Sequence, residues 1–339
     1  MKTFKILSVI LLLLFVACKE QNKSSNSTTP EDSSIADSTT VQKTYAEISI
    51  AKGGEWVDGP RDHKEYNGTT SFKNINELKV PDNHTDHSWY IRYEGPGWES
   101  NKVGYRLYLD WRNAIDIFGK KVDTMVLSKV GQDGFDSYHE PEPWGQDILK
   151  VGNGLGIGSI GRLVDNKVLH FKEVDSTFAS IENNADKSVV TVDYKGWKTG
   201  KDKIDLKSKL SITPDKRYTK HTIQSSKETT GISTGIVDHD VEYFTKESTN
   251  KEWAYIATYG EQTLVPDDLG MAIIYETETV SNVIDGEFDY LLEFKPTTNP
   301  ISFYFLGAWE QELNGIKTKD EFLKYLDSLL TELNSNNTL

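Results

Sequence analysis

The pattern of apolar and polar residues predicts a body made mostly of β-strands. Within residues 203–212, apolar side chains alternate with lysine and aspartate, so that Ile204, Leu206, Leu210 and Ile212 share one face. Further runs rich in aromatic and β-branched residues end near Gly, Asn, Asp or Pro. These runs occupy residues 105–109, 189–194, 253–259, 271–275, 288–294 and 302–306. Such spacing is typical of antiparallel sheets, and we expect an all-β fold, a large antiparallel β-sandwich.

One amphipathic helix is expected near the C-terminus. Thr318 and Glu321 have the spacing of a capping box, in which each side chain accepts a backbone N–H of the first helical turn. The residues that follow place one apolar stripe along a helix, formed by Phe322, Leu326, Leu329, Leu330 and Leu333. We expect this helix to cover one face of a sheet.

The first residues have the pattern of a secretion signal. Two lysines precede an apolar run at 6–16, which is shorter than the ~20 residues that a membrane-spanning helix needs. Ala17, a small residue, stands before Cys18, and residues 1–17 resemble a bacterial lipoprotein signal peptide. That resemblance implies that Cys18 is lipidated and anchors the protein to the outer membrane, on its periplasmic or cell-surface side. An ordinary signal peptide with an incidental cysteine is the alternative.

Composition divides the rest of the chain into a tether and a single domain. Residues 18–45 are rich in Ser and Thr and contain almost no residue that could build a core, so we expect a disordered tether. Residues 46–339 would then form one catalytic β-sandwich domain. Cys18 is the only cysteine among the 339 residues, so its acylation would exclude disulfides, thiolate zinc sites and a cysteine nucleophile from the folded body.

The charge balance argues against nucleic acid as a partner. The chain has 38 Lys and Arg against 52 Asp and Glu, a formal net charge of −14, whereas phosphate binding needs a clustered basic surface. No cofactor and no metal are expected. The glycine-rich residues 151–161 lack the Lys-Ser/Thr of a phosphate loop, and His84 and His87 show no third ligand. The sequence does not indicate an oligomeric state.

Residues 92–158 hold the densest mixture of aromatic and charged side chains, which suits the binding of a sugar. Aromatic faces bury the apolar side of a pyranose ring, while fixed charges bind its hydroxyl or carboxylate groups. Alternation places Arg106 and Tyr108 on one face of their strand. His139 has Tyr138 beside it and Asp147 nearby, an arrangement in which an imidazole can act as acid or base. If 138–139 is a regular strand, the two side chains diverge.

The motifs in this region resemble a family of secreted bacterial lipoproteins of formerly unknown function that take part in polysaccharide utilisation. The resemblance covers most of the body and is sharpest at residues 92–158. It is carried by Trp98-Glu99, Arg106 with Tyr108, Ile115-Asp116, Lys120-Lys121, Tyr138-His139, Gly145-x-Asp147 and Lys150-Val151-Gly152. The family is similar to the oligosaccharide dehydratase of ulvan degradation in marine flavobacteria.

The resemblance implies an anionic oligosaccharide substrate and the removal of water from its non-reducing-end uronic acid, giving a 4,5-unsaturated sugar. This elimination needs a neutralised carboxylate, a base for the C5 proton and an acid for the C4 hydroxyl. We expect Arg106 to bind the carboxylate, and His139 and Tyr138 to transfer protons. Asp116 or Glu99 would orient these two residues. The expected substrate contacts are Trp98, Glu99, Tyr108, Lys121, Trp144, Asp147 and Lys150, with Trp98 and Trp144 as sugar platforms and a lysine as an alternative to Arg106.

Two other functions fit the same residues. A non-catalytic carbohydrate-binding lipoprotein would also use the aromatic side chains and the tether. A different sugar enzyme on a mutarotase-like supersandwich, such as a lyase that cleaves glycosidic bonds or an epimerase, would share the fold class, and fold alone does not separate these activities. Burial distinguishes the first two functions, because convergence of His139 and Arg106 in one pocket favours catalysis, whereas a flat aromatic strip with both residues exposed favours binding.

Overall fold

The computed structural model describes residues 42–60, 63–68, 71–133 and 137–339, and this part of the chain forms one compact unit. The predicted signal peptide, Cys18 and nearly all of the predicted tether lie outside the described residues. The first strand, β1 (Thr44–Ala51), begins two residues before the predicted domain start at residue 46. Thr44 is already buried, so the boundary of the folded body is corrected to this strand.

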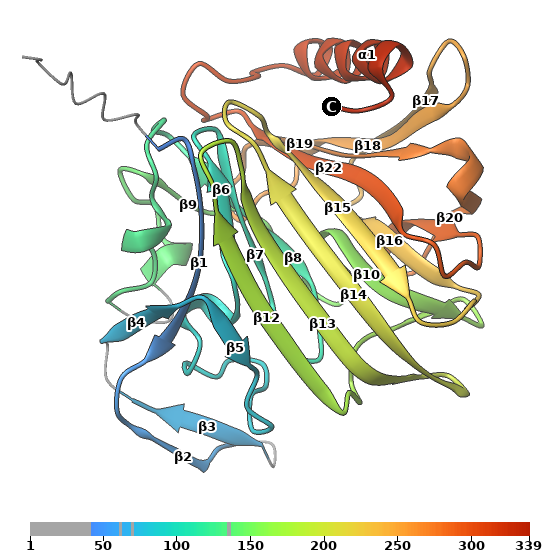
Figure 1. The fold of residues 1–339 in the computed structure, drawn as a ribbon. Helices are drawn as coiled ribbons and strands as arrows, with labels where there is room; N and C mark the ends of the chain where they lie inside the picture. The colour runs from blue at the N-terminus through green and yellow to red at the C-terminus, as the bar shows by residue number, and fades with distance from the viewer. Residues whose placement is uncertain (1–41, 61–62, 69–70, 134–136) are drawn as a thin grey trace, which may run out of the picture. The chain divides into compact units, whose positions relative to one another are not determined.

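The largest sheet of the described body has nine antiparallel strands and lies at the front of Figure 1. Its strand order is β17-β18-β19-β22-β15-β14-β13-β12-β5. The strand bounds are β5 (Glu77–Lys79), β12 (Ser176–Asn183), β13 (Ser188–Thr199), β14 (Asp202–Ile212), β15 (Tyr218–Ser225), β17 (Glu242–Glu247), β18 (Trp253–Glu261), β19 (Asp268–Glu276) and β22 (Ile301–Trp309).

Two smaller antiparallel sheets form the opposite layer. The six-stranded sheet, in the order β4-β1-β6-β7-β8-β9, adds to β1 the strands β4 (Phe72–Ile75), β6 (Gly97–Ser100), β7 (Val103–Leu107), β8 (Ile115–Lys120) and β9 (Gly145–Asp147). The five-stranded sheet, in the order β11-β10-β16-β21-β20, consists of β10 (Ile157–Val164), β11 (Lys167–Leu169), β16 (Ile232–Val237), β20 (Val280–Asp285) and β21 (Asp289–Phe294). A separate hairpin pairs β2 (Glu55–Asp58) with β3 (Lys64–Asn67).

The main core lies between the two layers. Ile117 of β8, Ile236 of β16 and Phe305 of β22 are all fully buried in one hydrophobic cluster, although each belongs to a different sheet. The expected alternation on β14 is present, with Ile204, Leu206, Leu210 and Ile212 buried on one face. The predicted antiparallel β-sandwich is therefore confirmed, because each sheet buries one apolar face against the other layer.

The predicted C-terminal helix is also confirmed as α1 (Lys319–Asn336). Thr318 and Glu321 form the capping box, and the five residues of the predicted apolar stripe are the ones that α1 buries. The helix packs on the outer face of the nine-stranded sheet, where alternation along β18 points Tyr255 and Ala257 toward it and Ile256 toward the main core. Figure 1 shows α1 at one edge of this sheet, above β18 and β19.

Four short 3-10 helices interrupt the loops of the described body: η2 (Arg92–Glu94), η3 (Leu127–Lys129), η4 (Ser137–His139) and η5 (Thr277–Thr279). η3 and η4 lie against the outer face of the six-stranded sheet, where Leu127 and Tyr138 pack on Phe118 in a small second core. Among the helices described, none is long and apolar enough to cross a membrane.

The glycine-rich segment before β10 brings the two smaller sheets into contact. Gly156 has a φ of 72°, and a Cβ atom there would lie 1.9 Å from the carbonyl oxygen of Ile115 at the start of β8. Only glycine fits such a position, because it tolerates both the left-handed backbone and the close approach. The segment is therefore a site of close backbone packing.

Candidate functional site

Strand register places three charged side chains on the outer face of the six-stranded sheet. Arg106 of β7 lies opposite Asp116 of β8, and Phe118 of β8 lies opposite Asp147 of β9. Because side chains two residues apart on a strand share a face, all four lie on the same side of the sheet. Neighbouring positions such as Ile117 point into the main core instead. The face that carries the charges is covered by the small core around Phe118.

Arg106 is the centre of this group. Its Nη2 donates to Asp116 Oδ2 at 2.8 Å and to Asp147 Oδ2 at 2.6 Å, and its Nη1 donates to Tyr138 Oη at 2.8 Å. Tyr108 Oη donates to Asp116 Oδ2 at 2.6 Å and accepts from Arg106 Nη2 at 2.9 Å. We call this group, together with His139, the Arg106 cluster: Arg106, Tyr108, Asp116, Tyr138, His139 and Asp147.

His139 is the most exposed member of the Arg106 cluster. Its Nε2 lies 3.3 Å from Asp147 Oδ2, and its side chain is 33% exposed, whereas the side chains of Arg106 and Asp147 are 2% and 1% exposed. Tyr138 and His139 belong to η4, not to a strand, and their rings lie 4.4 Å apart. Because η4 is a 3-10 turn, in which successive side chains lie about 120° apart, Tyr138 and His139 do not point in opposite directions as they would on a regular strand.

Burial and charge shift the proton affinities of the Arg106 cluster. Burial and the nearby charge of Asp147 raise the pKa of Asp116 to about 7, against the opposing effect of Arg106. For His139, burial alone would lower the pKa, but the hydrogen bond to Asp147 and its charge outweigh burial, so the pKa of His139 is raised. Burial raises the pKa of the Tyr138 hydroxyl, which stays protonated. Asp116 thus titrates near neutral pH, and the pKa of His139 lies above its usual value.

A chain of ion pairs leads from the Arg106 cluster to the loop between β7 and β8. Glu94 Oε2 lies 3.7 Å from Arg106 Nη1, and its Oε1 accepts from Arg112 Nη2 at 2.6 Å. Arg112 also donates to both carboxylate oxygens of Asp110, and its guanidinium lies 4.0 Å from the ring centroid of Tyr108. Burial raises the pKa of Glu94, but Arg112 and Arg106 outweigh it and lower the pKa overall. Glu94 therefore stays ionised between the two guanidinium groups.

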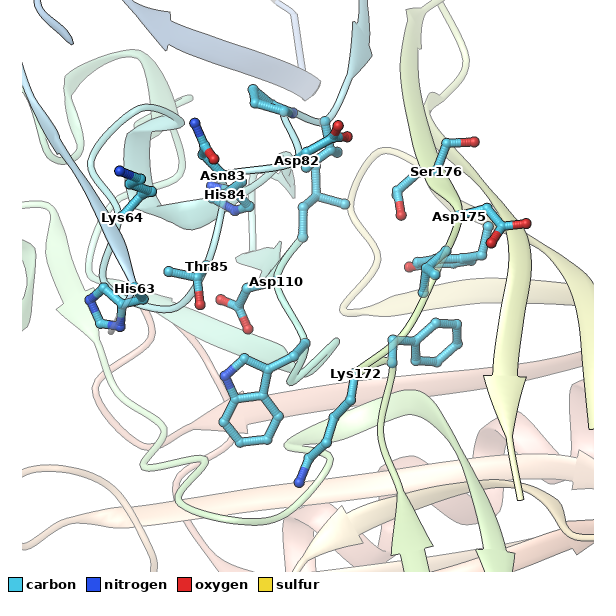
Figure 2. A pocket seen from close by; sticks show the side chains of 18 residues that line it. His63, Lys64, Asp82, Asn83, His84, Thr85, Asp110, Lys172, Asp175 and Ser176 are labelled. Atoms are coloured by element: carbon cyan, nitrogen blue, oxygen red, sulfur yellow. The ribbon is translucent and has the colours of Figure 1, made fainter. Parts of the chain in front are cut away.

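Asp110 lines a pocket of about 600 Å³, the larger of two that adjoin this loop. Figure 2 shows His63, Lys64 and the loop of Asp82 to Thr85 on one side of it, with Lys172, Asp175 and Ser176 on the other. The size is within the range of small-molecule sites, about 300 to 1,000 Å³. None of the Arg106 cluster lines this pocket. His84 lies in its wall, where its Nδ1 is 2.7 Å from Ser88 Oγ.

A second pocket of about 280 Å³ lies on the other side of the β7–β8 loop. Trp111 and Lys172 line both pockets, and Arg112 lines the second. Asp289 at the start of β21 lies at its base, where burial raises the pKa of the carboxyl group to about 7 and Oδ1 accepts from the backbone N–H of Leu155 at 2.7 Å.

Two predicted substrate contacts belong to the protein interior. Trp98 is fully buried, its Nε1 donates to Thr219 Oγ1 at 2.8 Å, and its ring stacks on Tyr105. Glu99 is fully buried as well, paired with Lys120 Nζ at 2.6 Å and accepting the backbone N–H groups of Val126 and Leu127. No surface of either side chain is open to a sugar, so the predicted binding roles are corrected to structural ones.

Two further predicted contacts, Tyr108 and Asp147, are buried in the Arg106 cluster, and the last three are Lys121, Trp144 and Lys150. Lys121 is half-buried with its Nζ 5.5 Å from the Trp309 ring centroid, and Trp144 packs edge-on against Phe118. Lys150 is exposed. None of these three lines either pocket. Within the described ranges, no group of three or more His, Cys, Asp or Glu side chains is arranged to hold a metal ion.

No sequence motif assigned a role to the residues that link the Arg106 cluster to the pockets. Asp110, Trp111 and Arg112 lie in the turn after β7, and Glu94 and Lys172 come from distant segments. A usable signal was present in the loop itself, since Asp-Trp-Arg-Asn between two buried strands is unusually rich in side chains that bind ligands. Glu94 and Lys172 carried no such signal, because only the tertiary fold brings them to this loop.

A comparison with known families assigns the chain to one of them. The family described as "Domain of unknown function (DUF4861)" matches residues 12–338. The chain belongs to this family. No curated protein matches the chain.

Two solved structures are similar in part. One is a TPR-domain containing protein from Parabacteroides distasonis, with 8% identity, a TM-score of 0.34, and coverage of 78% of this chain and 54% of the other. The second is a putative aldose 1-epimerase from Klebsiella pneumoniae, with 7% identity, the same TM-score of 0.34, and coverage of 87% and 97%. The chain thus spans about half the length of the first, and neither similarity bears on its activity.

Proposed function

We propose that this protein is a carbohydrate-active lyase that eliminates water from the non-reducing-end uronic acid of an anionic, ulvan-type oligosaccharide. The observation that carries the proposal is the Arg106 cluster, in which buried charged groups converge on one partly exposed imidazole, His139. Buried ion pairs contribute little net stability, and groups with shifted pKa values gather at functional sites. The family resemblance noted in the sequence supplies the substrate class.

His139 is the residue placed to transfer protons. When its Nε2–H donates to Asp147, the lone pair of the neutral imidazole lies on Nδ1, which can accept the C5 proton of the uronate. The C4–O bond then breaks, the C4–C5 double bond forms, and the imidazolium returns the proton to the departing hydroxyl group, which leaves as water. Asp147 stabilises the imidazolium between the two transfers.

The other predicted catalytic residues act through His139. The guanidinium of Arg106 already binds two carboxylates and two tyrosine hydroxyls, so it does not bind the substrate carboxylate as expected, and it holds Asp147 in place. Tyr138 is 2% exposed, so it supports the imidazole ring. Asp116 is 1% exposed and contacts Arg106. All three are positioning residues in this mechanism.

A single proton-transfer residue restricts the substrate. His139 can remove the C5 proton and protonate the C4 oxygen without moving only if both lie on the same face of the sugar ring, as they do in glucuronate. An iduronate unit, with the C5 proton on the opposite face, should react far more slowly. The proposal predicts this order of rates for two oligosaccharides that differ only at C5.

The test is incubation with saturated, uronate-ended oligosaccharides, followed by ultraviolet absorbance and mass spectrometry. A product one water lighter that absorbs as a conjugated uronate supports the dehydratase. Two shorter fragments would indicate a lyase that cleaves chains. Binding without any product would indicate the carbohydrate-binding lipoprotein instead.

The proposal includes a lipid anchor at Cys18, supported by the lipoprotein-like pattern of residues 1–17. In a bacterial host that processes lipoproteins, Cys18→Ser should move the protein from the membrane fraction to the soluble fraction, because the acylated residue is lost. An equal membrane fraction for the wild type and Cys18→Ser would contradict the anchor.

A further inference from the structure

Trp111 and Lys172 form the boundary between the two pockets. Both residues line the pocket of about 600 Å³ and the pocket of about 280 Å³. Trp111 comes from the β7–β8 loop and Lys172 from the segment before β12, so two separate parts of the fold meet there. Lys172 is labelled in Figure 2 at the lower edge of the larger pocket. A ligand that occupies both pockets must pass these two side chains.

The indole of Trp111 is held in a fixed orientation. Its Nε1 donates to Asp86 Oδ1 at 3.2 Å, the ring of His170 meets it edge to face at 5.8 Å, and its backbone oxygen accepts from Phe171 at 3.0 Å. The side chain is nevertheless half-exposed, unlike that of Trp98 in the core. A fixed and partly open aromatic face is suited to stacking against the apolar face of a sugar ring.

The ammonium group of Lys172 has no carboxylate partner in the described part of the chain. Lys172 is exposed, and its Nζ lies 5.4 Å from the centroid of the Trp111 ring. A cation held over an aromatic face at an exposed site gains about 0.5 to 1 kcal/mol, which a direct pair with an anion can replace. Lys172 is therefore available to an anionic group of a ligand on Trp111.

The smaller pocket has an excess of positive charge. Arg112, Lys167 and Lys172 line it, against the acidic residues Glu287 and Asp289. Burial raises the pKa of Asp289 to about 7, so below neutral pH this carboxyl is mostly uncharged. Arg112 is already paired with Glu94 and Asp110, so Lys167 and Lys172 are the cations of this pocket that an anionic ligand would meet.

We propose that the two pockets together bind a chain of acidic sugar rings, with one ring stacked on Trp111 and its carboxylate or sulfate group paired with Lys172. Each pocket then holds sugar units on one side of that ring. This inference deepens the proposed function, from which it takes the class of substrate. It does not depend on the elimination reaction.

The test compares binding of defined oligosaccharides to folded variants of the full-length protein by calorimetry. The probes are a uronate disaccharide, the tetrasaccharide with and without sulfate, and the tetrasaccharide with its carboxyl groups reduced to alcohols. Lys172→Gln should weaken binding of the acidic tetrasaccharide by roughly tenfold, the effect of one lost charge-assisted hydrogen bond, and leave binding of the reduced tetrasaccharide without sulfate unchanged. Lys207→Gln, at an exposed lysine on β14 outside both pockets, is the matched control.

A second variant tests the aromatic contact. Trp111→Ala should abolish the gain in affinity from disaccharide to tetrasaccharide, and Trp111→Phe should keep part of it. A loss on Lys172→Gln that appears only with sulfated probes assigns the sulfate to Lys172, and a loss without sulfate assigns the carboxylate. Unchanged tetrasaccharide affinity in Lys172→Gln, or an unchanged gain in folded Trp111→Ala, would overturn the inference. If no unsaturated product forms while these binding effects hold, only the elimination reaction is rejected.

Discussion

Asp147 is the residue that determines how His139 behaves. It accepts from Arg106 at 2.6 Å and faces Nε2 of His139 at 3.3 Å, so one carboxylate links the buried cation to the partly exposed imidazole. The side chain of Asp147 is 1% exposed and that of His139 is 33% exposed, so water and salt screen the attraction between them less than they screen a surface ion pair. The raised pKa of His139 then sets the pH below which the base is protonated and inactive.

Asp147→Asn should shift the acidic limb of the pH–rate profile to lower pH. The amide removes the charge and weakens the hydrogen bond that raise the pKa of His139, and burial, which lowers it, then dominates. The rate at high pH should also fall, because the imidazolium loses its stabilising anion. The measurement is the rate of unsaturated product formation from pH 5 to pH 9. An acidic limb that stays in place in Asp147→Asn would mean that His139 is not the base.

Arg106→Ala should destabilise the fold as well as reduce turnover. It leaves Asp116 and Asp147 buried without their cation, which costs on the order of 3 to 5 kcal/mol. The cost should be smaller at low pH, because protonated carboxyl groups need no cation, and it should grow as pH rises through the raised pKa of Asp116.

Chemical denaturation at pH 5 and pH 8 measures this difference. Lys207→Ala, which removes an exposed lysine at 4.0 Å from Asp193, is the control and should change stability by less than about 1 kcal/mol. A loss in Arg106→Ala that is equal at both pH values would show that the buried carboxylates are not its cause.

At the level of secondary-structure elements, the periodic pattern of apolar and polar residues predicted the buried face correctly where the opposite face is exposed to solvent. It placed the buried residues of β14 and the apolar stripe of α1, whose capping box fixes the start of the helix. It failed for β6, whose residues are buried on both faces, so that Trp98 and Glu99 resembled surface binding residues in the sequence. The 3-10 turn η4 was missed because three residues carry no periodicity.

The buried carboxyl group of Asp289 links β21 to the segment before β10 and should make the free energy of unfolding depend on pH. Asp289 of β21 accepts the backbone N–H of Leu155, just before β10, and burial raises its pKa to about 7. A carboxyl whose folded pKa is raised stabilises the fold at low pH, and this contribution is lost as pH rises through about 7. Asp289→Asn keeps an oxygen acceptor for Leu155 and removes the titration.

Asp289→Asn should therefore be more stable than the wild type at pH 8, by an amount on the order of a few kcal/mol, with little difference at pH 4. The measurement is the free energy of unfolding of both proteins across this range. A variant that is less stable than the wild type at pH 8 would show that the charged carboxylate is needed there.

For the whole molecule, the sequence was sufficient for the fold class and insufficient for the arrangement of the site. Regular alternation and turn residues predict the antiparallel sandwich, because the apolar residues of each strand mark the face that it buries. The contact between Arg106 and Asp147 depends on the register of the three strands β7, β8 and β9. Lys172 lines the larger pocket only because the fold brings its segment next to the β7–β8 loop. No local pattern in a single sequence contains that information.

The net charge of −14 adds a second property of the whole molecule. An anionic oligosaccharide is repelled at long range, so association depends on the local positive charge around Lys172 and on ionic strength. Salt screens the long-range repulsion more than contacts inside a pocket. The repulsion is therefore weakest in media of high ionic strength.

The most direct test of the account measures unsaturated product from a glucuronate-ended oligosaccharide with the wild type, His139→Ala and His239→Ala. His239 is a half-buried histidine between two aspartates that lines neither pocket, so it is a matched control. The account predicts a product one water lighter from the wild type and His239→Ala, and none from folded His139→Ala. Wild-type turnover by His139→Ala would contradict the central role of this histidine.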